Sequence, residues 1–453
     1  MAGILTISPG HDASYPWRQI GTSEESRGAS LTDYYLSPAA KGGEPPGRWS
    51  GRGCRALGLL TGDVVDRAVF EPMYGKFADP RDPSGGTALG RAPQRFRPAA
   101  EIYRAMLAAE PEAVAERRAQ LRIEARAQAR TPVLFFDATF SISKTITLLH
   151  ASALANAAQA ADRGDAEAAR YWERAAAEVW GCIALGNQAA LEYLQDQAGY
   201  TRSGYHGRRA DGVEAGRWED AHQWVIASFP QHTSRDGDPQ LHIHNLILNR
   251  VPRERDRAWR TLDSRALFRE RGAASAIATF VAENELQRRF SVGWVLRADG
   301  HGREVAGVPA ELVEMFSSRR ASITPLAQLL AAEFKRQHGR EPDARALGAL
   351  HQLANGLTRR GKDDEPLDIP ALVRQWAGRA RACETARLET VTPQVTSRTG
   401  PHSAPAAARA TGLPAPAPGC PAAHRPCPAW SARWRADAAR PRPGRQARGR
   451  VGA

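Results

Sequence analysis

The chain has 453 residues, and 42% of them are hydrophobic, so most of it is long and apolar enough to build a sizeable core. Its net charge of +13 is unevenly spread. Residues 391–453 carry ten arginines and one aspartate, with no lysine or glutamate, so the rest of the chain is only mildly basic. Bulk charge alone therefore does not establish nucleic-acid binding.

Targeting and cross-linking signals are lacking in the sequence. No run of about 18 apolar residues occurs, and the N-terminal segment has no basic stretch followed by an apolar one. We therefore expect no membrane insertion, no signal peptide and a cytoplasmic location. Five scattered cysteines, an odd number, argue against a disulfide framework.

Strand and helix patterns alternate from residue 132 onward. The expected strands are 132–141, 221–229 and 240–251. The expected helices are 143–161, 165–198, 264–290 and 308–338, with shorter ones in 340–382. A turn-rich segment joins the last two strands, so we expect them to be antiparallel neighbours. The fold class is α+β, with helices flanking a central antiparallel β-sheet.

The segment 391–453 is rich in Pro, Ala and Arg and has little periodic apolar pattern, so we expect a disordered tail. Its composition also resembles a high-GC gene read in an alternative frame, which indicates a frameshifted or truncated end.

Two histidines alternate in the expected strand 240–251. His242 and His244 point to one face, while Leu241 and Ile243 point to the other. One divalent ion can take a nitrogen from each imidazole, and His232, on the facing strand or its turn, can supply a third. Three neutral ligands leave coordination positions open for catalysis. An HxH pair by itself also fits the polar face of an ordinary strand.

Asp137 interrupts the apolar strand 132–141, where a carboxylate is costly unless it is paired. A carboxylate that accepts the second N–H of a metal-bound imidazole would explain it. The alternative is a strand-end residue that meets solvent or a helix N-terminus.

A bound metal could polarise a phosphodiester oxygen, and the reaction then needs a nucleophile. Water is one candidate. Tyr34 and Tyr35, which precede a Gly/Pro-rich segment, are others. A tyrosine pair alone is more often a packing feature.

Together these segments resemble the relaxase domain of MobF-type conjugative relaxases, which belong to the HUH endonuclease superfamily. The matching stretches occur in the family's order over about residues 1–380. They are "DYY…GEPPGRWSGRGCRALGL", "FFDATFSISKT", "HTSRDGDPQLHIHNLILNRV" and "WRTLDSRALF", with weaker matches in "REVAGVPAELVEMFSSRRASI" and "HGREPDARALGALHQLANGLTRR". Tyr34 precedes His242, which is the order of relaxases rather than of replication initiators.

The resemblance implies cleavage of one DNA strand at a plasmid origin of transfer by tyrosine attack, which leaves a 5′-phosphotyrosyl link and a free 3′-hydroxyl and so initiates conjugative transfer. The implied metal ligands are His232, His242 and His244. Asp137 would orient a histidine and accept the tyrosine proton. The implied nucleophile is Tyr34, with Tyr35 beside it and Tyr15 as an additional catalytic tyrosine.

Two departures from the family pattern stand out. The first tyrosine pair is reduced to Tyr15, followed by Pro16, which puts a two-tyrosine cycle in doubt. Several members carry the first histidine one residue earlier, where this chain has Gln231.

The implied substrate is single-stranded DNA at the transfer origin, and accessory transfer and coupling proteins are further implied partners. Arg235 and Lys144 could contact phosphates, while Trp49, Arg52 and Trp259 could stack on or cradle bases. A structural role is about as probable for each of these five residues. The expected cofactor is a divalent ion, Mg or Mn, although Zn, Co or Ni also suits imidazole ligands.

The domains we expect are a catalytic domain at 1–300, a helical part at 301–390 and the tail at 391–453. No phosphate-cradling GxxxxGK[ST] loop occurs, so the helicase domain common in this family is not expected. Two other functions stay open: a non-catalytic single-stranded DNA-binding remnant, and a three-histidine metal hydrolase that uses water.

Overall fold

The structure is a computed structural model. It describes residues 4–14, 17, 43–204, 207–209, 212–214, 216–297, 300, 302–358, 368–382 and 387–391. All of these residues belong to one structural unit, residues 1–396. Tyr15, Tyr34 and Tyr35 lie outside the described residues, as does all of the expected tail except Val391.

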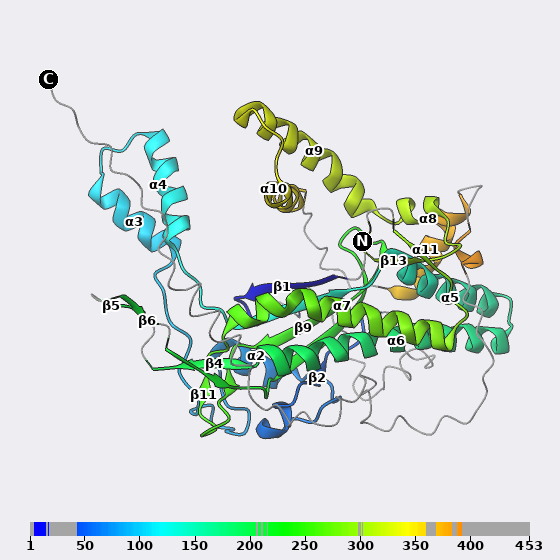
Figure 1. Cartoon of the computed structure of the whole chain (residues 1–453), viewed down its shortest axis with the longest axis horizontal. Coiled ribbons are helices and arrows are strands. Elements are labelled where there is room, and N and C mark those ends of the chain that lie inside the picture. Colours follow the sequence, from blue (N-terminus) through cyan, green and yellow to red (C-terminus); the bar gives the residue numbers. More distant parts are fainter. Residues whose placement is uncertain are drawn as a thin grey trace, which may run out of the picture. The chain divides into compact units, whose positions relative to one another are not determined.

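Among the described residues, five strands form a central sheet in the order β1-β3-β9-β8-β2 (Figure 1). They are β1 (Ile4–Gly10), β2 (Arg48–Ser50), β3 (Phe135–Ser141), β8 (Ile226–Thr233) and β9 (Pro239–Leu248). All four neighbouring pairs in this sheet are antiparallel. With helices packed against the sheet, this confirms the predicted α+β fold and the pairing of β8 with β9.

Long helices cover one side of the sheet, which we call the helix face (Figure 1). They are α5 (Lys144–Asp162), α6 (Ala166–Ala198) and α7 (Ser264–Arg289). Each begins where a polar N-cap side chain accepts a backbone N–H bond from the first turn. These caps are Ser143, Asp165 and Asp263. The apolar residues of β9 that face these helices, such as Ile243 and Ile247, join the largest core cluster.

A polar network fixes α6 on the sheet. Asn245 of β9 is fully buried, and its Nδ2 donates to Asn187 Oδ1 at 2.7 Å and to the Ala138 carbonyl at 2.8 Å. Ser228 Oγ of β8 donates to Asn245 Oδ1 at 2.8 Å. Buried amides must be hydrogen-bonded, so this network specifies which residues of α6, β3 and β8 meet β9.

Among the described residues, the other side of the sheet is covered only in part, by α2 (Arg67–Lys76) and the residues that pack with it. The Phe70 and Tyr74 rings of α2 stack with centroids 4.0 Å apart, and Tyr74 Oη donates to the Leu246 carbonyl at 2.8 Å. This packing covers the end of β9 near Leu246 and Leu248. The preceding residues of β9 on this side, His242 and His244, stay partly exposed, so we call this side the open face.

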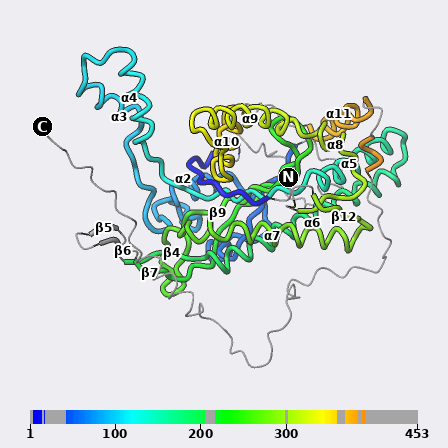
Figure 2. The backbone as a smooth tube through the Cα atoms, turned by 45° about the horizontal axis from the view of Figure 1, so that its top comes forward, coloured from blue at the N-terminus to red at the C-terminus, as the bar shows by residue number. Residues whose placement is uncertain are grey.

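Among the described residues, helices predominate from residue 310 onward (Figure 2). Its helices are α8 (Ala310–Met315), α9 (Ser318–His338), α10 (Ala344–Leu357), α11 (Ile369–Arg381) and the 3₁₀ turn η4 (Leu388–Thr390). In Figure 2, α9 and α10 lie side by side. The domain boundary at 300 stays a prediction; β12 (Trp294–Leu296) pairs with β13 (Arg303–Val305) across it.

Several elements escaped the sequence patterns. They are β1, β2, the 3₁₀ turn η3 (Cys54–Leu57), α2, α3 (Ala99–Ala109), α4 (Ala115–Gln128) and the short paired strands β4 (Tyr200–Ser203), β5 (Gly207–Arg209), β6 (Gly212–Glu214), β7 (Arg217–Asp220), β10 (Val251–Pro252) and β11 (Trp259–Arg260). Within the described residues, every helix is too short or too polar to span a bilayer.

The most consequential difference concerns the length of β8. The expected strand 221–229 is displaced, because β8 begins at Ile226 and continues to Thr233. The Pro and Gln of "PQHTSRDGDP" suggested a turn, but pairing with β9 holds this segment extended. As a result His232 is a strand residue, and its direction is set by strand alternation.

Close packing of α6 on α7 leads to a stability prediction. An alanine Cβ at Gly186 would lie 2.3 Å from the Ala278 carbonyl oxygen, whereas one at Gly181, also in α6, would meet Arg289 Nη1 at 3.7 Å. We expect Gly186→Ala to lower the free energy of unfolding by about 1–3 kcal/mol through overpacking. Gly181→Ala should raise it by about 0.5–1 kcal/mol through the lower backbone entropy of the unfolded chain. Urea unfolding of both variants tests this; equal effects would contradict the packing.

Candidate functional site

His242 and His244 lie together on the open face. Their rings meet edge to face with centroids 5.1 Å apart, and both side chains are partly exposed. Leu241 and Ile243, which alternate with them, are buried against the helices. The strand thus presents two adjacent imidazoles on a surface that a ligand can reach.

Asp137 of β3 orients one of these imidazoles. His244 Nδ1 donates to Asp137 Oδ2 at 2.8 Å. Thr139 lies opposite His244 in the β3–β9 pair, and its Oγ1 donates to Asp137 Oδ1 at 2.9 Å. Asp137 is 6% exposed, so the carboxylate is paired rather than solvated. Because Nδ1 carries the proton, Nε2 is the nitrogen of His244 able to bind a metal.

A carbonyl group of its own strand, β9, fixes His242 in the same tautomer as His244. His242 Nδ1 lies 2.9 Å from the Gln240 carbonyl oxygen, which can only accept a hydrogen bond. The proton therefore resides on Nδ1, and Nε2 is again the ligand atom. Two neutral imidazoles with matched tautomers form a suitable half-site for a divalent ion.

His232 does not join this pair. Its backbone N donates to both Glu44 carboxylate oxygens, at 2.8 and 3.0 Å, and its Nδ1 donates to Glu44 Oε2 at 2.8 Å. The side chains of His232 and Glu44 are 2% and 0% exposed. The ring packs on the helix face, 5.6 Å from the His150 ring of α5 and 5.7 Å from Trp180 of α6.

This structure therefore does not bring His232 together with His242 and His244, and its role as the third histidine ligand stays a prediction. Over the described residues, no three His, Cys, Asp or Glu side chains are grouped so that they could hold a metal ion. Gln231 is the residue of β8 that lies opposite His242. The physical reason is strand alternation, which sends His232 to the other side of the sheet from Gln231.

Sequence reasoning missed Glu44 and His150. Both are fully or almost fully buried polar residues, and each lies against His232. Burial, with a smaller effect from the neighbouring His232, holds the pKa of His150 well below its usual value of 6.5. A glutamate within the unusual segment "GGEPPG" was the available signal for Glu44, whereas His150 sits in an ordinary helical pattern.

The predicted DNA contacts at the two tryptophans are not favoured by the structure. Trp49 is 3% exposed and packs in the aromatic cluster with Phe70 and Tyr74, so it is not available for base stacking. Trp259 of β11 is partly buried and packs against the same cluster.

The three basic residues differ in their surroundings. Lys144 Nζ donates to the Pro239 carbonyl at 2.6 Å, and burial lowers its pKa to about 8, so this side chain holds the start of β9. Arg52 forms an ion pair with Asp196 of α6. Arg235 is partly exposed in the loop between β8 and β9.

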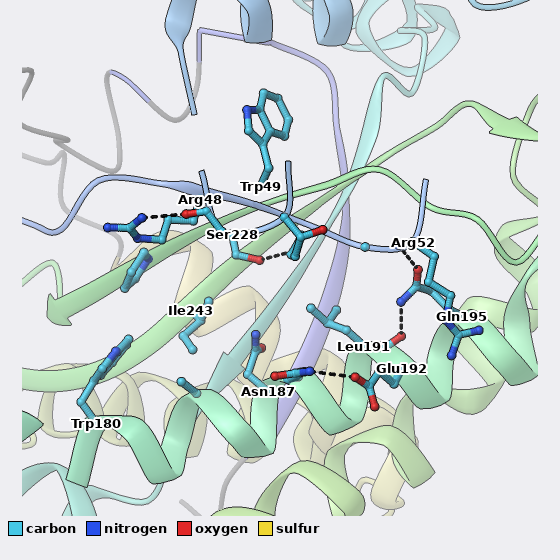
Figure 3. A pocket seen from close by; sticks show the side chains of 17 residues that line it. Arg48, Trp49, Arg52, Trp180, Asn187, Leu191, Glu192, Gln195, Ser228 and Ile243 are labelled. Atoms are coloured by element: carbon cyan, nitrogen blue, oxygen red, sulfur yellow. Dashed lines mark hydrogen bonds between the residues drawn. The ribbon is translucent and has the colours of Figure 1, made fainter. Parts of the chain in front are cut away.

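A cavity of about 440 Å³ lies between β2 and α6 (Figure 3). Its lining includes Arg48, Arg52, Asn187, Trp180 and Ile243. Figure 3 shows Ile243 on the cavity side of the sheet and Trp49 directed away from the α6 side chains. The cavity is therefore on the helix face, separated by the sheet from His242 and His244.

The buried imidazole of His150 predicts a pH dependence of stability. His150 stays neutral in the folded protein but takes up a proton below about pH 6.5 once unfolded. Its contribution to stability is therefore complete above that pH and is lost as the pH falls. As the pH falls, the unchanged chain should lose stability relative to the His150→Leu variant. We expect the difference between their unfolding free energies to change by up to about 1.4 kcal/mol per pH unit. Urea unfolding between about pH 7.5 and 5.5 measures it; parallel profiles would refute it.

The comparisons with known proteins point to one family. A family model described as TrwC relaxase matches residues 10–383. The multifunctional conjugation protein TraI of Escherichia coli is 36% identical over 107 residues, which are 22% of this chain and 6% of TraI, so the chain matches only a small part of that relative.

Two solved structures of the conjugative relaxase TrwC in complex with oriT DNA, one metal-bound and one metal-free, have similar folds. Both align with a TM-score of 0.51 over 85% of this chain and 100% of theirs, at 21% and 20% identity respectively. The fold likeness and the TraI match agree with the family model, which spans well over half of the sequence. The resemblance predicted from the motifs is thus confirmed: the chain belongs to the TrwC relaxase family.

Proposed function

We propose that this chain nicks one DNA strand at a plasmid origin of transfer by metal-assisted tyrosine attack and so initiates conjugative transfer. The family membership and the oriT DNA in the similar TrwC structures support the substrate. The observation that carries the chemistry is the His242–His244 pair on the open face, with Asp137 behind it.

The donor set fits a divalent ion. His242 and His244 present Nε2 atoms of fixed tautomer, and the buried Asp137 strengthens one of them as a ligand. The TrwC structures described as metal-bound and copper-bound support the proposal of such an ion. When bound, the ion would withdraw charge from a phosphodiester oxygen of the DNA.

Tyr34 is the proposed nucleophile, with Tyr35 and Tyr15 as further catalytic tyrosines. The phenolate oxygen forms a bond to phosphorus, and the bond from phosphorus to the 3′ oxygen breaks. The products are a 5′-phosphotyrosyl link and a 3′-hydroxyl. Asp137 is the proposed acceptor of the phenol proton. Tyr34 stands ten residues before Glu44, which is bonded to the β8 backbone at His232. Ten residues of extended chain span at most about 36 Å, which is the largest separation of Tyr34 and Glu44 that the chain allows.

Arg235 is the proposed phosphate contact, because its loop joins the two strands of the site, β8 and β9, and its side chain is partly exposed. We further propose a division into domains at residue 300 and a tail at 391–453. Accessory transfer and coupling proteins are the further proposed partners. Mg or Mn is the proposed ion.

Adduct formation tests the function directly. Single-stranded oligonucleotides that tile the transfer region, labelled at the 3′ end, should yield label covalently linked to the protein when Mn²⁺ or Mg²⁺ is added. Tyr34→Phe should reduce this signal to background. His242→Ala should slow it by at least about 100-fold while DNA binding persists, since metal polarisation is worth several kcal/mol.

The same assay separates the alternatives. Full adduct formation by the combined Tyr15→Phe, Tyr34→Phe and Tyr35→Phe variant would show the nucleophile assignment to be wrong. Cleaved but unlinked label would favour a metal hydrolase that uses water. Binding without cleavage would favour a non-catalytic remnant.

Salt dependence tests the phosphate contact. Arg235→Gln should reduce the slope of log affinity against log salt concentration by about one, because one phosphate contact is lost. Lys144→Met is the matched control and should leave the slope unchanged, since the Lys144 ammonium is bonded to the Pro239 carbonyl. Fluorescence anisotropy with a labelled oligonucleotide measures both. The opposite result would reverse the two assignments.

A further inference from the structure

We infer that Gln231, through its side-chain amide oxygen, is the third protein ligand of the cation held by His242 and His244, and that His232 is not a ligand. This inference rests on the proposed metal-assisted function and concerns the composition of that same site.

Strand register places Gln231 next to the histidine pair. β8 and β9 pair antiparallel, with Phe229 opposite His244 and Gln231 opposite His242. Opposed residues in such a ladder share a face, with Cβ atoms about 4.5–5.5 Å apart. Gln231 is therefore on the open face. It lies two residues along β8 from Phe229, which is opposite His244, the imidazole that Asp137 orients.

The sheet gives His232 no route to that face. Between the pairs Gln231–His242 and Thr233–Pro239 the register shifts, so His232 alone lies opposite two residues of β9. This irregularity bends the ladder and fixes His232 toward α5 and α6. Turning the ring over would also leave the carboxylate of Glu44, which is 0% exposed, without its imidazole donor.

The donor set predicts a metal preference. Two imidazole nitrogens and one amide oxygen form a harder set than three imidazoles, and they add no negative charge. Affinity for Ni²⁺ and Zn²⁺ should fall relative to Mn²⁺ and Mg²⁺, which favour oxygen ligands.

Metal titration of the chelator-treated full chain without DNA tests the inference. We expect Gln231→Ala to weaken Mn²⁺ binding by at least about tenfold. We expect Gln231→His to raise the affinity for Ni²⁺ by at least about tenfold more than that for Mn²⁺. Gln188→Ala, at an exposed glutamine of α6, is the control for a Gln-to-Ala change and should have no effect.

Variants of His232 test whether this histidine contributes to metal binding. His232→Gln, which keeps an N–H donor for Glu44, and His232→Ala should lower the melting temperature but leave Mn²⁺ affinity unchanged. Loss of Mn²⁺ binding in His232→Gln equal to that in His242→Ala, with Gln231→Ala unaffected, would overturn the inference.

The outcomes distinguish this inference from the proposed function. If Mn²⁺ binding depends on His242 and Gln231 but no DNA adduct forms, the site stands and the nicking function fails. If the unchanged chain shows no His242-dependent Mn²⁺ binding, both fail.

Discussion

The pairing of β8 with β9 is the constraint on which the candidate site depends. Successive side chains of a strand point to opposite faces, so one register decides the surroundings of every residue in both strands. Here it sets His242, His244 and Gln231 on the open face. The same register commits His232 to the helix face, and the register shift beside it marks where regular pairing ends.

The two faces make different electrostatic demands. On the open face, His242 and His244 are partly exposed and hold their ligand nitrogens in fixed tautomers. On the helix face, the His232 ring is withdrawn from water and bonded to the buried Glu44 carboxylate, which also accepts from the His232 backbone N and the Thr233 hydroxyl. Removing the imidazole would leave the buried Glu44 carboxylate short of a hydrogen-bond donor, so His232 is held in place more firmly than a surface histidine would be.

Patterns that depend on near neighbours in the chain predicted well. The alternation of imidazole and apolar residues around Ile243 located the histidine face, and the cost of a carboxylate in an apolar strand drew attention to Asp137. Helices α5, α6 and α7 also agree with their apolar spacing. Trp49 was predicted poorly, because a tryptophan suited to base stacking and one buried under a helix look alike in sequence.

The sequence by itself determined the family, the fold class and the residue types of the site, because each is encoded in local spacing and in motif order. Only the tertiary structure decided which of the neighbours Gln231 and His232 faces the histidine pair. That choice depends on how far β8 extends and how it registers with β9, and Pro230 and Gln231 suggested a turn when read alone. Long-range pairing overrides such local preferences because it satisfies the backbone hydrogen bonds of the whole strand.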